Sequence, residues 1–391
     1  MHLEKLELID VRSYQRAQLR LDLGVTVFVG PNAQGKTNIV EAVQRVSTGG
    51  SHRSAGDTVL VRVGAQNGAI RAQAIDDDGR TRTIDVALGS GRTQTKVDGH
   101  PVRRTLDSIG IIRTVLFAPE DLAIVRGDPS ERRAFLDQLL AQRRPAYAAV
   151  RAEYERALRQ RSQLLKQLRG LGPSARATAQ ATLDTWSEQL VHHGSQLLAA
   201  RLAGVEALGP TVDAAYRRLA DRPDPVTLKY RSAVTDAWFD EHRDGPLPAV
   251  AEIANRFHDR LIDRRDEEIA RGVTLVGPHR DDVEIVLGSL LARAYASHGE
   301  AWSTALALKL GSAALLRDVG DRPIVLLDDV FAELDDVRRR QLAQMCGDYD
   351  QVLVTAAVEA DVPLAGDRYD VRIENGVSSV IARGVDGEVA D

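Results

Sequence analysis

Cysteine is almost absent from this sequence of 391 residues, which contains Cys346 alone. One cysteine excludes the disulfide framework on which small secreted domains depend, and it is typical of a protein kept in a reducing compartment. We therefore expect a cytoplasmic protein in which Cys346 is a small buried side chain rather than a nucleophile.

Long apolar runs and an excess of basic charge are missing as well. No apolar run is long enough to span a bilayer, and the N-terminus lacks a signal-peptide pattern because residues 1–4 lead straight into an alternating strand, so we expect no membrane association. The formal net charge is −5, which excludes a surface that is basic all over but allows a local basic face. The hydrophobic content of 43% is typical of a globular protein, and the length predicts two or three domains.

Residues 30–37 match the phosphate-binding pattern G-x-x-x-x-G-K-[ST]. A β-branched apolar run precedes the pattern, and a helix start follows it. Strand, glycine loop and helix in this order direct backbone N–H groups at a polyphosphate, which favours a nucleotide site over a plain glycine turn. Lys36 would reach the β- and γ-phosphates, and Thr37 would bind Mg²⁺. The predicted nucleotide-binding residues of this loop are Gly30, Pro31, Asn32, Ala33, Gln34, Gly35, Lys36, Thr37 and Asn38.

A second motif of nucleotide sites, the Walker B segment, is indicated by the apolar run 324–327, which ends in Asp328 and Asp329. Asp328 would hold Mg²⁺ with its water shell, and Asp329 stands where a base beside the γ-phosphate is needed. Small P-loop GTPases and kinases place these two motifs much closer together than the gap of about 290 residues found here. The spacing therefore predicts an insertion between two halves of one ATPase head. Residues 331–335 resemble the acid-rich turn, the D-loop, that touches the partner subunit in ATP-binding-cassette heads.

Ser297 and Gly299 lie in front of a predicted helix. A Ser-x-Gly turn at a helix N-terminus either binds an anion through backbone N–H groups and the helix dipole or is an ordinary N-cap. The Walker B segment follows about 28 residues downstream. This order and spacing are those of an ATP-binding-cassette signature and favour the anion site.

Periodicity along the chain predicts three segments. Residues 1–129 form the N-terminal part of an α/β head, residues 130–270 a helical arm, and residues 271–391 the C-terminal part of the head, with a parallel sheet and crossover helices. Asp98-Gly99 is a hairpin signal, and Gly209-Pro210 is expected to end a helix. The predicted strands are 3–9, 25–29, 58–63, 69–75, 84–88, 273–276, 283–287, 324–328 and 351–355. The predicted helices are 131–170, 174–208, 249–270, 300–317 and 336–346.

With these motifs in place, the chain resembles the RecF family of DNA repair proteins, relatives of the SMC ATPases with a short helical arm instead of a long coiled coil. The resemblance covers nearly the full length. It implies an α/β fold, an ATP-binding-cassette (SMC/RecF-like) P-loop ATPase head with an inserted helical arm. The segments that carry it are 30–38, 51–53, 116–122 (Leu-Phe-Ala-Pro-Glu-Asp-Leu), 127–133, 277–282 (Gly-Pro-His-Arg-Asp-Asp) and 326–330.

The resemblance also implies a function. ATP and Mg²⁺ would be the cofactors, and two heads would form an ATP-dependent homodimer that hydrolyses ATP slowly. The protein would bind single- and double-stranded DNA at gaps and help RecO–RecR mediators load recombinase. Lys36, Asp329 and Glu120 would be catalytic, with Glu120 near the loop that senses Mg²⁺ and γ-phosphate, or else a solvated turn acid.

We expect DNA to contact arginines, because their positive charge binds the phosphates of the DNA backbone. Such contacts give affinity without sequence specificity. Residues 131–170 carry ten basic and four acidic side chains in a protein of negative net charge. The alternative is that these cations solvate a helix face or pair with its acids. The predicted DNA-binding residues are Arg53, Arg132, Arg133, Arg143 and Arg144.

Three positions depart from the family pattern. Glu300 stands where the signature continues with glutamine, and Asp329 replaces the glutamate of most such heads, which predicts slow hydrolysis. Thr355 ends strand 351–355, where transporters carry a switch histidine, and a hydroxyl cannot provide the same charge.

Three rival interpretations are open. The first is another SMC-like repair ATPase, which the short arm disfavours. The second is a metabolic P-loop kinase, which the long arginine-rich insertion disfavours, and the third is a DNA-binding scaffold with an inactive site.

Overall fold

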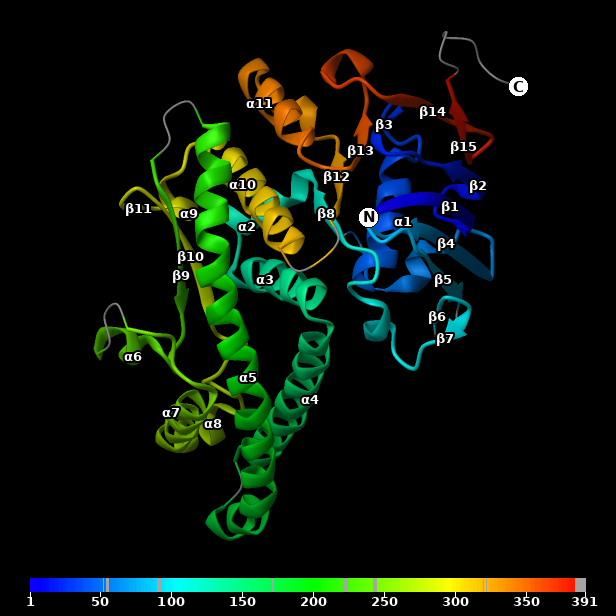
Figure 1. Ribbon diagram of the computed structural model, residues 1–391. Coiled ribbons are helices and arrows are strands. Elements are labelled where there is room, and N and C mark those ends of the chain that lie inside the picture. The colour runs from blue at the N-terminus through cyan, green and yellow to red at the C-terminus, as the bar shows by residue number, and fades with distance from the viewer. Residues whose placement is uncertain are drawn as a thin grey trace. The chain divides into compact units, whose positions relative to one another are not determined.

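The computed structural model describes residues 1–51, 53, 56–89, 93–170, 172–220, 224–241, 245–318, 320 and 322–383, with the backbone alone for residues 173–179. The chain forms two compact units (Figure 1). The first consists of Met1–Ala123, Pro210–Pro225 and Ala296–Asp391, and the second of Ile124–Gly209 and Val226–Tyr295. In sequence, the second unit thus interrupts the first twice, before and after residues 210–225.

The first unit contains an antiparallel sheet with the strand order β2-β1-β4-β5-β6-β7. A register shift between Leu3 and Lys5 lets Leu3, Leu6 and Leu8 all point into the core, although Leu3 and Leu6 are three residues apart. The Asp98-Gly99 hairpin is confirmed, because Val97 pairs with His100 and both turn residues have positive φ, as a two-residue hairpin turn requires. The strands are β1 His2–Val11, β2 Tyr14–Arg20, β4 Asn67–Ile75, β5 Thr81–Gly89, β6 Gln94–Val97 and β7 His100–Pro101.

The second sheet of this unit has the order β15-β14-β3-β13-β12-β8. Strands β14, β3, β13, β12 and β8 run parallel, and β15 is antiparallel to β14. Strand β13 lies between the strand before the P-loop, β3, and the Walker B strand, β12. The carboxyl ends of these strands therefore meet at one edge of the sheet, which is where open α/β sheets bind ligands. The strands are β3 Gly24–Val29, β8 Thr114–Phe117, β12 Ile324–Asp328, β13 Gln351–Ala356, β14 Asp367–Glu374 and β15 Val377–Ala382.

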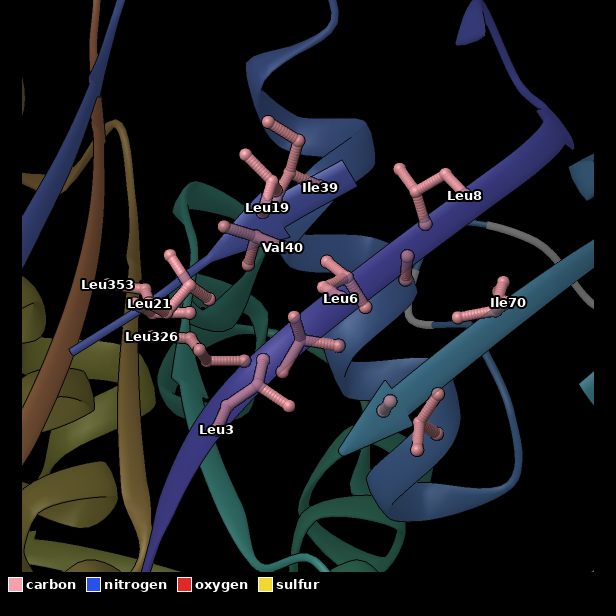
Figure 2. Close-up of a cluster of buried hydrophobic side chains, with 14 of the residues drawn as sticks. Leu3, Leu6, Leu8, Leu19, Leu21, Ile39, Val40, Ile70, Leu326 and Leu353 are labelled. Carbon is pink, nitrogen blue, oxygen red and sulfur yellow. The ribbon is translucent and has the colours of Figure 1, made fainter. Parts of the chain in front are cut away.

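Helix α1 (Lys36–Thr48) contributes to one hydrophobic core that both sheets share. Figure 2 shows leucines of β1 and β2 meeting Ile39 and Val40 of α1 together with Leu326 and Leu353 of the parallel sheet. The N-terminus of α1, and with it the P-loop, is thereby fixed against the sheet. Helices α10 (His298–Arg317) and α11 (Asp336–Cys346) complete this part, and Cys346 is buried as expected.

The second unit is mainly helical. Its long helices α3 and α4 each begin at a proline, Pro129 and Pro145, which the first helical position tolerates because its N–H has no helical partner. A small sheet of order β11-β10-β9 accompanies them. The elements are α3 Pro129–Arg143, α4 Pro145–Leu168, the first part of α5 Pro173–Leu219, β9 Val226–Arg231, α6 Asp236–Glu241, α7 Val250–Asp263, α8 Arg265–Arg271, β10 Asp282–Leu287, β11 Leu290–Leu291 and α9 Ala292–Tyr295.

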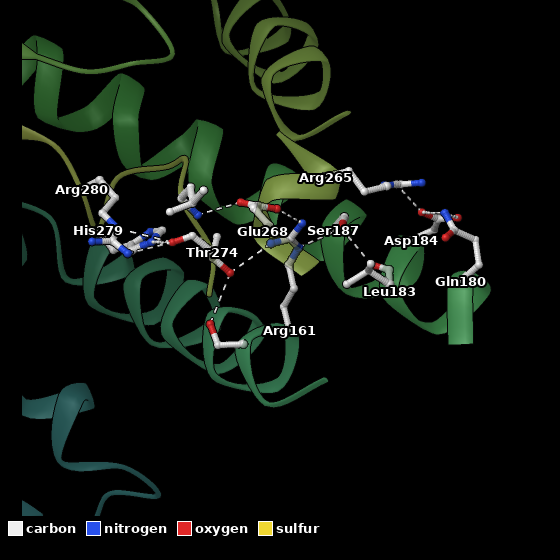
Figure 3. Close-up of polar contacts among 12 residues, drawn as sticks. Arg161, Gln180, Leu183, Asp184, Ser187, Arg265, Glu268, Thr274, His279 and Arg280 are labelled. Atoms are coloured by element: carbon white, nitrogen blue, oxygen red, sulfur yellow. Dashed lines mark hydrogen bonds and ion pairs between the residues drawn. The ribbon is translucent and has the colours of Figure 1, made fainter. Parts of the chain in front are cut away.

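Buried charge also cross-links this unit (Figure 3). The guanidinium of Arg161 on α4 donates to Ser187 Oγ on α5 at 2.9 Å, to Thr274 Oγ1 at 3.0 Å and to Glu268 Oε2 on α8 at 2.6 Å. Arg161 and Glu268 are both fully buried. A buried pair of this kind is tolerated because each charge has several hydrogen bonds, and it ties three helices to one loop.

Five predictions about the fold were wrong in detail. The predicted helix 131–170 is two helices, α3 and α4, separated at the extended residue Arg144. Residues 58–63 are not a strand, since residues 57–60 form a short 3₁₀ helix. Residues 273–276 form a loop whose Thr274 carbonyl accepts hydrogen bonds from Arg280. Gly209-Pro210 does not end α5, because the following turns are stabilised by packing of buried Val212 against Gly311. The predicted helix 249–270 is two helices, α7 and α8, separated at Arg264.

The boundaries of the units also differ from the expected residues 130 and 270. Residues 271–295 belong to the second unit because β10 pairs with β9 along its whole length, from Asp282 with Arg231 to Leu287 with Val226. Residues 210–225 belong to the first unit, to which the last turns of α5 contribute.

Candidate nucleotide site

The P-loop joins β3 to α1 in a conformation that only particular residues permit. Gly35 has φ 109°, and a Cβ there would lie 2.7 Å from Ser378 Oγ. A Cβ on Gly30 would collide with the carbonyl oxygen of Val371. The two predicted glycines are therefore required by backbone geometry and by close approach to β14 and β15.

Contacts with neighbouring strands hold the loop in shape. Tyr14 donates its hydroxyl to the Gly35 carbonyl at 3.1 Å, and Ser378 donates to the Gln34 carbonyl at 2.7 Å. The side chain of Gln34 accepts from the Ile373 N–H at 2.6 Å, and Asn38 donates to Ser13 Oγ at 2.9 Å. The predicted residues Gln34 and Asn38 thus shape the loop through contacts with β14 and the β1–β2 turn. Such support from a second layer of residues is typical of a preorganised binding site.

Lys36 is buried at the start of α1 with 3% of its surface exposed. Its ammonium donates to the carbonyls of Gly30 at 2.7 Å and Pro31 at 3.0 Å, and so spans the loop. Burial lowers the pKa of Lys36, while the carboxylates of Asp329 and Asp328 act in the opposite direction. The structure therefore brings the predicted lysine and both predicted acids together.

Thr37 and Asp328 lie in contact although 291 residues separate them in sequence. Thr37 Oγ1 donates to Asp328 Oδ1 at 2.9 Å, and Asp328 is buried. One hydroxyl and one carboxylate side by side are hard oxygen ligands, and Mg²⁺ bound with a nucleotide uses one or two such groups beside phosphates and water. The pair therefore fits Mg²⁺, with Thr37 and Asp328 as the residues that would hold it.

Asp329 begins the turn after β12 in the left-handed region, with φ 55°. Its backbone N–H donates to Thr355 Oγ1 at 3.0 Å, and Thr355 Oγ1 donates to Asp328 Oδ1 at 2.6 Å. Asp329 Oδ1 is buried and has no hydrogen-bond partner among the residues that the structure describes. A buried carboxylate oxygen without a hydrogen-bond partner is suited to a base that takes a proton from water or substrate.

Glu120 is exposed in a short 3₁₀ turn, residues 119–121, directly after β8. Strand β8 pairs with β12, so Glu120 and Asp328 follow neighbouring parallel strands at the same sheet edge. Asp121 anchors the turn by accepting from the Ala118 N–H at 2.8 Å and by pairing with Lys309 Nζ at 2.8 Å. No direct bond joins Glu120 to the P-loop among the described residues.

Ser297 caps α10 in a reciprocal arrangement with Glu300. Ser297 Oγ accepts from the Glu300 N–H at 3.3 Å, and Glu300 Oε2 accepts from the Ser297 N–H at 2.7 Å. The N-cap interpretation of this turn is thus confirmed, and it leaves a second role of Ser297 open. Hydrogen bonds to Ser297 lower the pKa of Glu300, and burial acts in the opposite direction.

Gly299 lies against the guanidinium of Arg338 on α11, which a Cβ on Gly299 would approach to 3.2 Å. Arg338 also donates to Ser303 Oγ at 2.9 Å and pairs with Asp335. The signature turn and the acidic loop before α11 are therefore joined through one arginine.

The five predicted DNA-contact arginines differ in exposure. Arg132 is buried and donates to both carboxylate oxygens of Asp282, at 2.7 and 3.0 Å, so its prediction as a DNA contact is contradicted by its place in the interior of the second unit. Arg133 is partly buried and donates to the Asp281 carbonyl at 2.6 Å. Arg143 is also partly buried, Arg144 is exposed, and Arg53 is 41% exposed beside α1.

A buried ion pair under the P-loop helix was missed by the sequence reasoning. Glu41 on α1 is fully buried and accepts from Arg12 Nε at 2.9 Å and Arg12 Nη2 at 2.6 Å. Burial alone would raise the pKa of Glu41, but hydrogen bonds from Arg12 and Ser51 hold it below its ordinary value. Arg53 lies 4.0 Å from the same carboxylate. The residues one turn away from Glu41 on α1 are all polar, so the sequence pattern gave no signal that this acid is buried.

Nearly the whole chain matches one protein family. The model of the RecF/RecN/SMC N terminal domain matches residues 2–379. A protein of Cutibacterium acnes named DNA replication and repair protein RecF is 50% identical over 380 residues, which cover 95% of this chain and 96% of that protein. A protein of the same name from Streptomyces avermitilis is 47% identical over 379 residues, with 95% and 98% covered.

Solved structures agree with the sequence comparisons. The structure of the recombination mediator protein RecF-ATP in the RecFOR pathway matches with a TM-score of 0.86 and 26% identity, covering 97% of each chain. The Smc head domain of Pyrococcus furiosus bound to the C-terminal domain of ScpA matches with a TM-score of 0.56 and 18% identity, covering 98% of this chain and 97% of that chain, and supports the fold alone. Within the described part of the chain, no helix has the length and hydropathy needed to cross a membrane.

Proposed function

Because this chain belongs to the RecF family, we propose that it is an ATP-dependent DNA-binding protein of replication and recombinational repair that hydrolyses ATP slowly. The observation that carries the proposal is the hydrogen bond between Thr37 and Asp328, which brings the P-loop and the Walker B strand together. Relatives named as DNA replication and repair proteins support the biological role.

The residues have separable roles in this proposal. The P-loop backbone and Lys36 bind the triphosphate, and Thr37 with Asp328 holds Mg²⁺, which would neutralise charge that develops on the phosphates. Asp329 orients and deprotonates the attacking water. Its side chain is one methylene shorter than glutamate, so it holds that water less well and hydrolysis is slow. Glu120, at the same sheet edge, would lie near the loop that senses Mg²⁺ and the γ-phosphate.

ATP would join two copies of the chain. In this arrangement one subunit supplies Lys36, Thr37 and Asp328, and the other supplies Ser297 and Gly299 at the positive end of α10. The contact of Arg338 with Gly299 and Asp335 supports the arrangement, because it makes the signature turn and the loop before α11 a single surface. Dimerisation sets two DNA-binding surfaces side by side, so ATP strengthens DNA binding without touching DNA.

DNA partners would be single- and double-stranded molecules with gaps, and protein partners would be RecR- and RecO-like mediators. The similarity to the recombination mediator protein RecF of the RecFOR pathway supports this assignment. Arg53, Arg133, Arg143 and Arg144 remain as proposed DNA contacts; of the three on the arm, Arg144 is exposed and Arg133 and Arg143 are partly buried.

The test is DNA binding measured with ATP, with ADP and without nucleotide, for the parent protein and Lys36→Ala. We expect ATP to produce a dimer on gel filtration and to tighten DNA binding in the parent, and neither effect in the variant. Lys36→Ala should keep its fold, since its loop is also held by Tyr14, Ser378 and Ile373. ATP-dependent dimerisation of Lys36→Ala at the parent's affinity would refute the site assignment.

A further inference from the structure

Thr355 lies at the centre of the hydrogen bonds that connect the two acids of the site. It is the penultimate residue of β13, it is fully buried, and it pairs in register with Asp328 of β12 on one side and Phe28 of β3 on the other. Residues directly opposite each other on neighbouring strands point to the same face of a sheet. Thr355 is therefore positioned by the sheet itself between the P-loop strand and the Walker B strand.

The hydroxyl of Thr355 has one hydrogen to donate, and it donates it to Asp328 Oδ1 at 2.6 Å. The same carboxylate oxygen accepts from Thr37 Oγ1 at 2.9 Å. Two hydroxyl donors on one oxygen fix the rotation of the Asp328 carboxylate relative to α1. One of these donors, Thr37, is itself a proposed Mg²⁺ ligand, whereas Thr355 reaches the metal position only through Asp328.

The oxygen of Thr355 accepts from the backbone N–H of Asp329 at 3.0 Å, and the Thr355 carbonyl accepts from the same N–H at 3.3 Å. Asp329 has φ 55°, a conformation that an aspartate adopts only at some cost and that neighbouring contacts must maintain. One side chain thus holds the metal-binding acid by its carboxylate and the proposed base by its backbone.

We infer that Thr355 is a positioning residue of the nucleotide site, which sets the orientation of Asp328 toward Mg²⁺ and of Asp329 toward the attacking water. The inference rests on the proposed ATPase function. A histidine acting by charge is not needed for this role, because a neutral hydroxyl can donate and accept at once. Groups that orient a metal ligand in this way change metal affinity or activity by about 10–100-fold when they are removed.

The experiment measures how the affinity for a fluorescent ATP analogue depends on Mg²⁺ concentration, so that it does not rely on hydrolysis. Thr355→Val keeps the shape and removes the hydroxyl, and Thr355→Ser keeps the hydroxyl. Thr26→Val, at a buried threonine of the neighbouring strand β3, is the matched control for replacing a buried threonine. Hydrolysis is measured separately, so that kcat and KM are resolved.

We expect Thr355→Val to need about tenfold more Mg²⁺ for half-maximal binding. It should bind nucleotide like the parent in EDTA and show a lower kcat with a smaller change in KM. Thr355→Ser and Thr26→Val should follow the parent. If Thr355→Val does not fold, Thr355→Cys takes its place, because a thiol is only a weak donor.

Two outcomes overturn the inference in different ways. A parent-like Mg²⁺ dependence in Thr355→Val, with normal Mg²⁺-dependent binding in the parent, overturns the role of Thr355 alone. Absence of Mg²⁺-dependent nucleotide binding in the parent overturns the proposed function and the inference together.

Discussion

Arginine 132 provides a sharp test of which arginines in the second unit are structural. Its Nε and Nη2 donate to Asp282 at 2.7 and 3.0 Å, and its Nη1 donates to the Gly127 carbonyl at 2.9 Å. Removal of one partner from a buried ion pair costs about 3–5 kcal/mol, because the other charge is left without compensation. Asp282 keeps 20% of its side chain exposed, so water solvates part of the stranded carboxylate. We therefore expect Arg132→Ala to cost about 3 kcal/mol, at the low end of that range.

The assay is thermal unfolding followed by circular dichroism at neutral pH. For a unit of this size each kcal/mol lowers the melting temperature by about 2–4 °C, so Arg132→Ala should melt about 6–12 °C below the parent. The matched control is Arg144→Ala, because Arg144 is exposed and surface substitutions usually change stability by less than about 0.5 kcal/mol. The double variant Arg132→Ala/Asp282→Ala should recover part of the loss, since it removes the stranded charge. Equal melting temperatures for Arg132→Ala, Arg144→Ala and the parent would refute the reasoning.

Three further predictions concern the dimer, DNA and pH. Ser297→Arg should block ATP-dependent dimerisation in gel filtration while monomers still bind ATP, and loss of ATP binding by the monomer would argue against the shared site. Charge reversal at Arg143 and Arg144 together should lower DNA affinity and flatten its salt dependence while sparing ATP binding, and an unchanged affinity across a salt series would exclude the arm as the DNA surface. Burial raises the pKa of Asp281 to about 7 against opposing hydrogen bonds from Ser232 and Tyr230, so the folded state holds a proton that the unfolded state loses above about pH 4. Asp281→Asn should therefore gain stability over the parent as pH rises from 4 to 7 in urea unfolding, and a pH-independent difference would contradict this.

The buried polar groups of the second unit show how the most specific sequence segments are used. In segment 277–282, the Pro278 carbonyl accepts from Arg201 at 2.6 Å, His279 bonds to the Tyr154 hydroxyl at 2.7 Å, and Asp282 pairs with Arg132. Arg201 also binds Asp137 through two nitrogens, at 2.8 and 2.9 Å. The segments that carried the family resemblance in this unit therefore build its interior, and none of these four contacts belongs to the nucleotide site.

Sequence patterns selected residues that the structure brings together at the candidate nucleotide site, because the requirements of a P-loop are local. Gly30 and Gly35 are demanded by backbone conformation and close approach, and Lys36 and Thr37 follow at fixed positions on α1. The strands β3 and β12 were recognisable because strands buried on both faces are continuous apolar runs. Parallel strands run in the same direction, so their carboxyl ends lie at one edge of the sheet. A parallel sheet therefore places the two motifs, which follow β3 and β12, at the same edge.

Other features depend on residues that are distant in sequence. A row of arginines on a helix has the same composition whether it faces solvent or an acid, so only the packing of α3 against β10 decided that Arg132 pairs with Asp282. The continuation of α5 past Pro210 depends on contact with Gly311, which local propensity does not contain. Residue 355 could be recognised from sequence as the last polar position of a strand. Its two hydrogen bonds were decided by the register of β12 against β13, because strand pairing is set by the sheet as a whole and not by either strand alone.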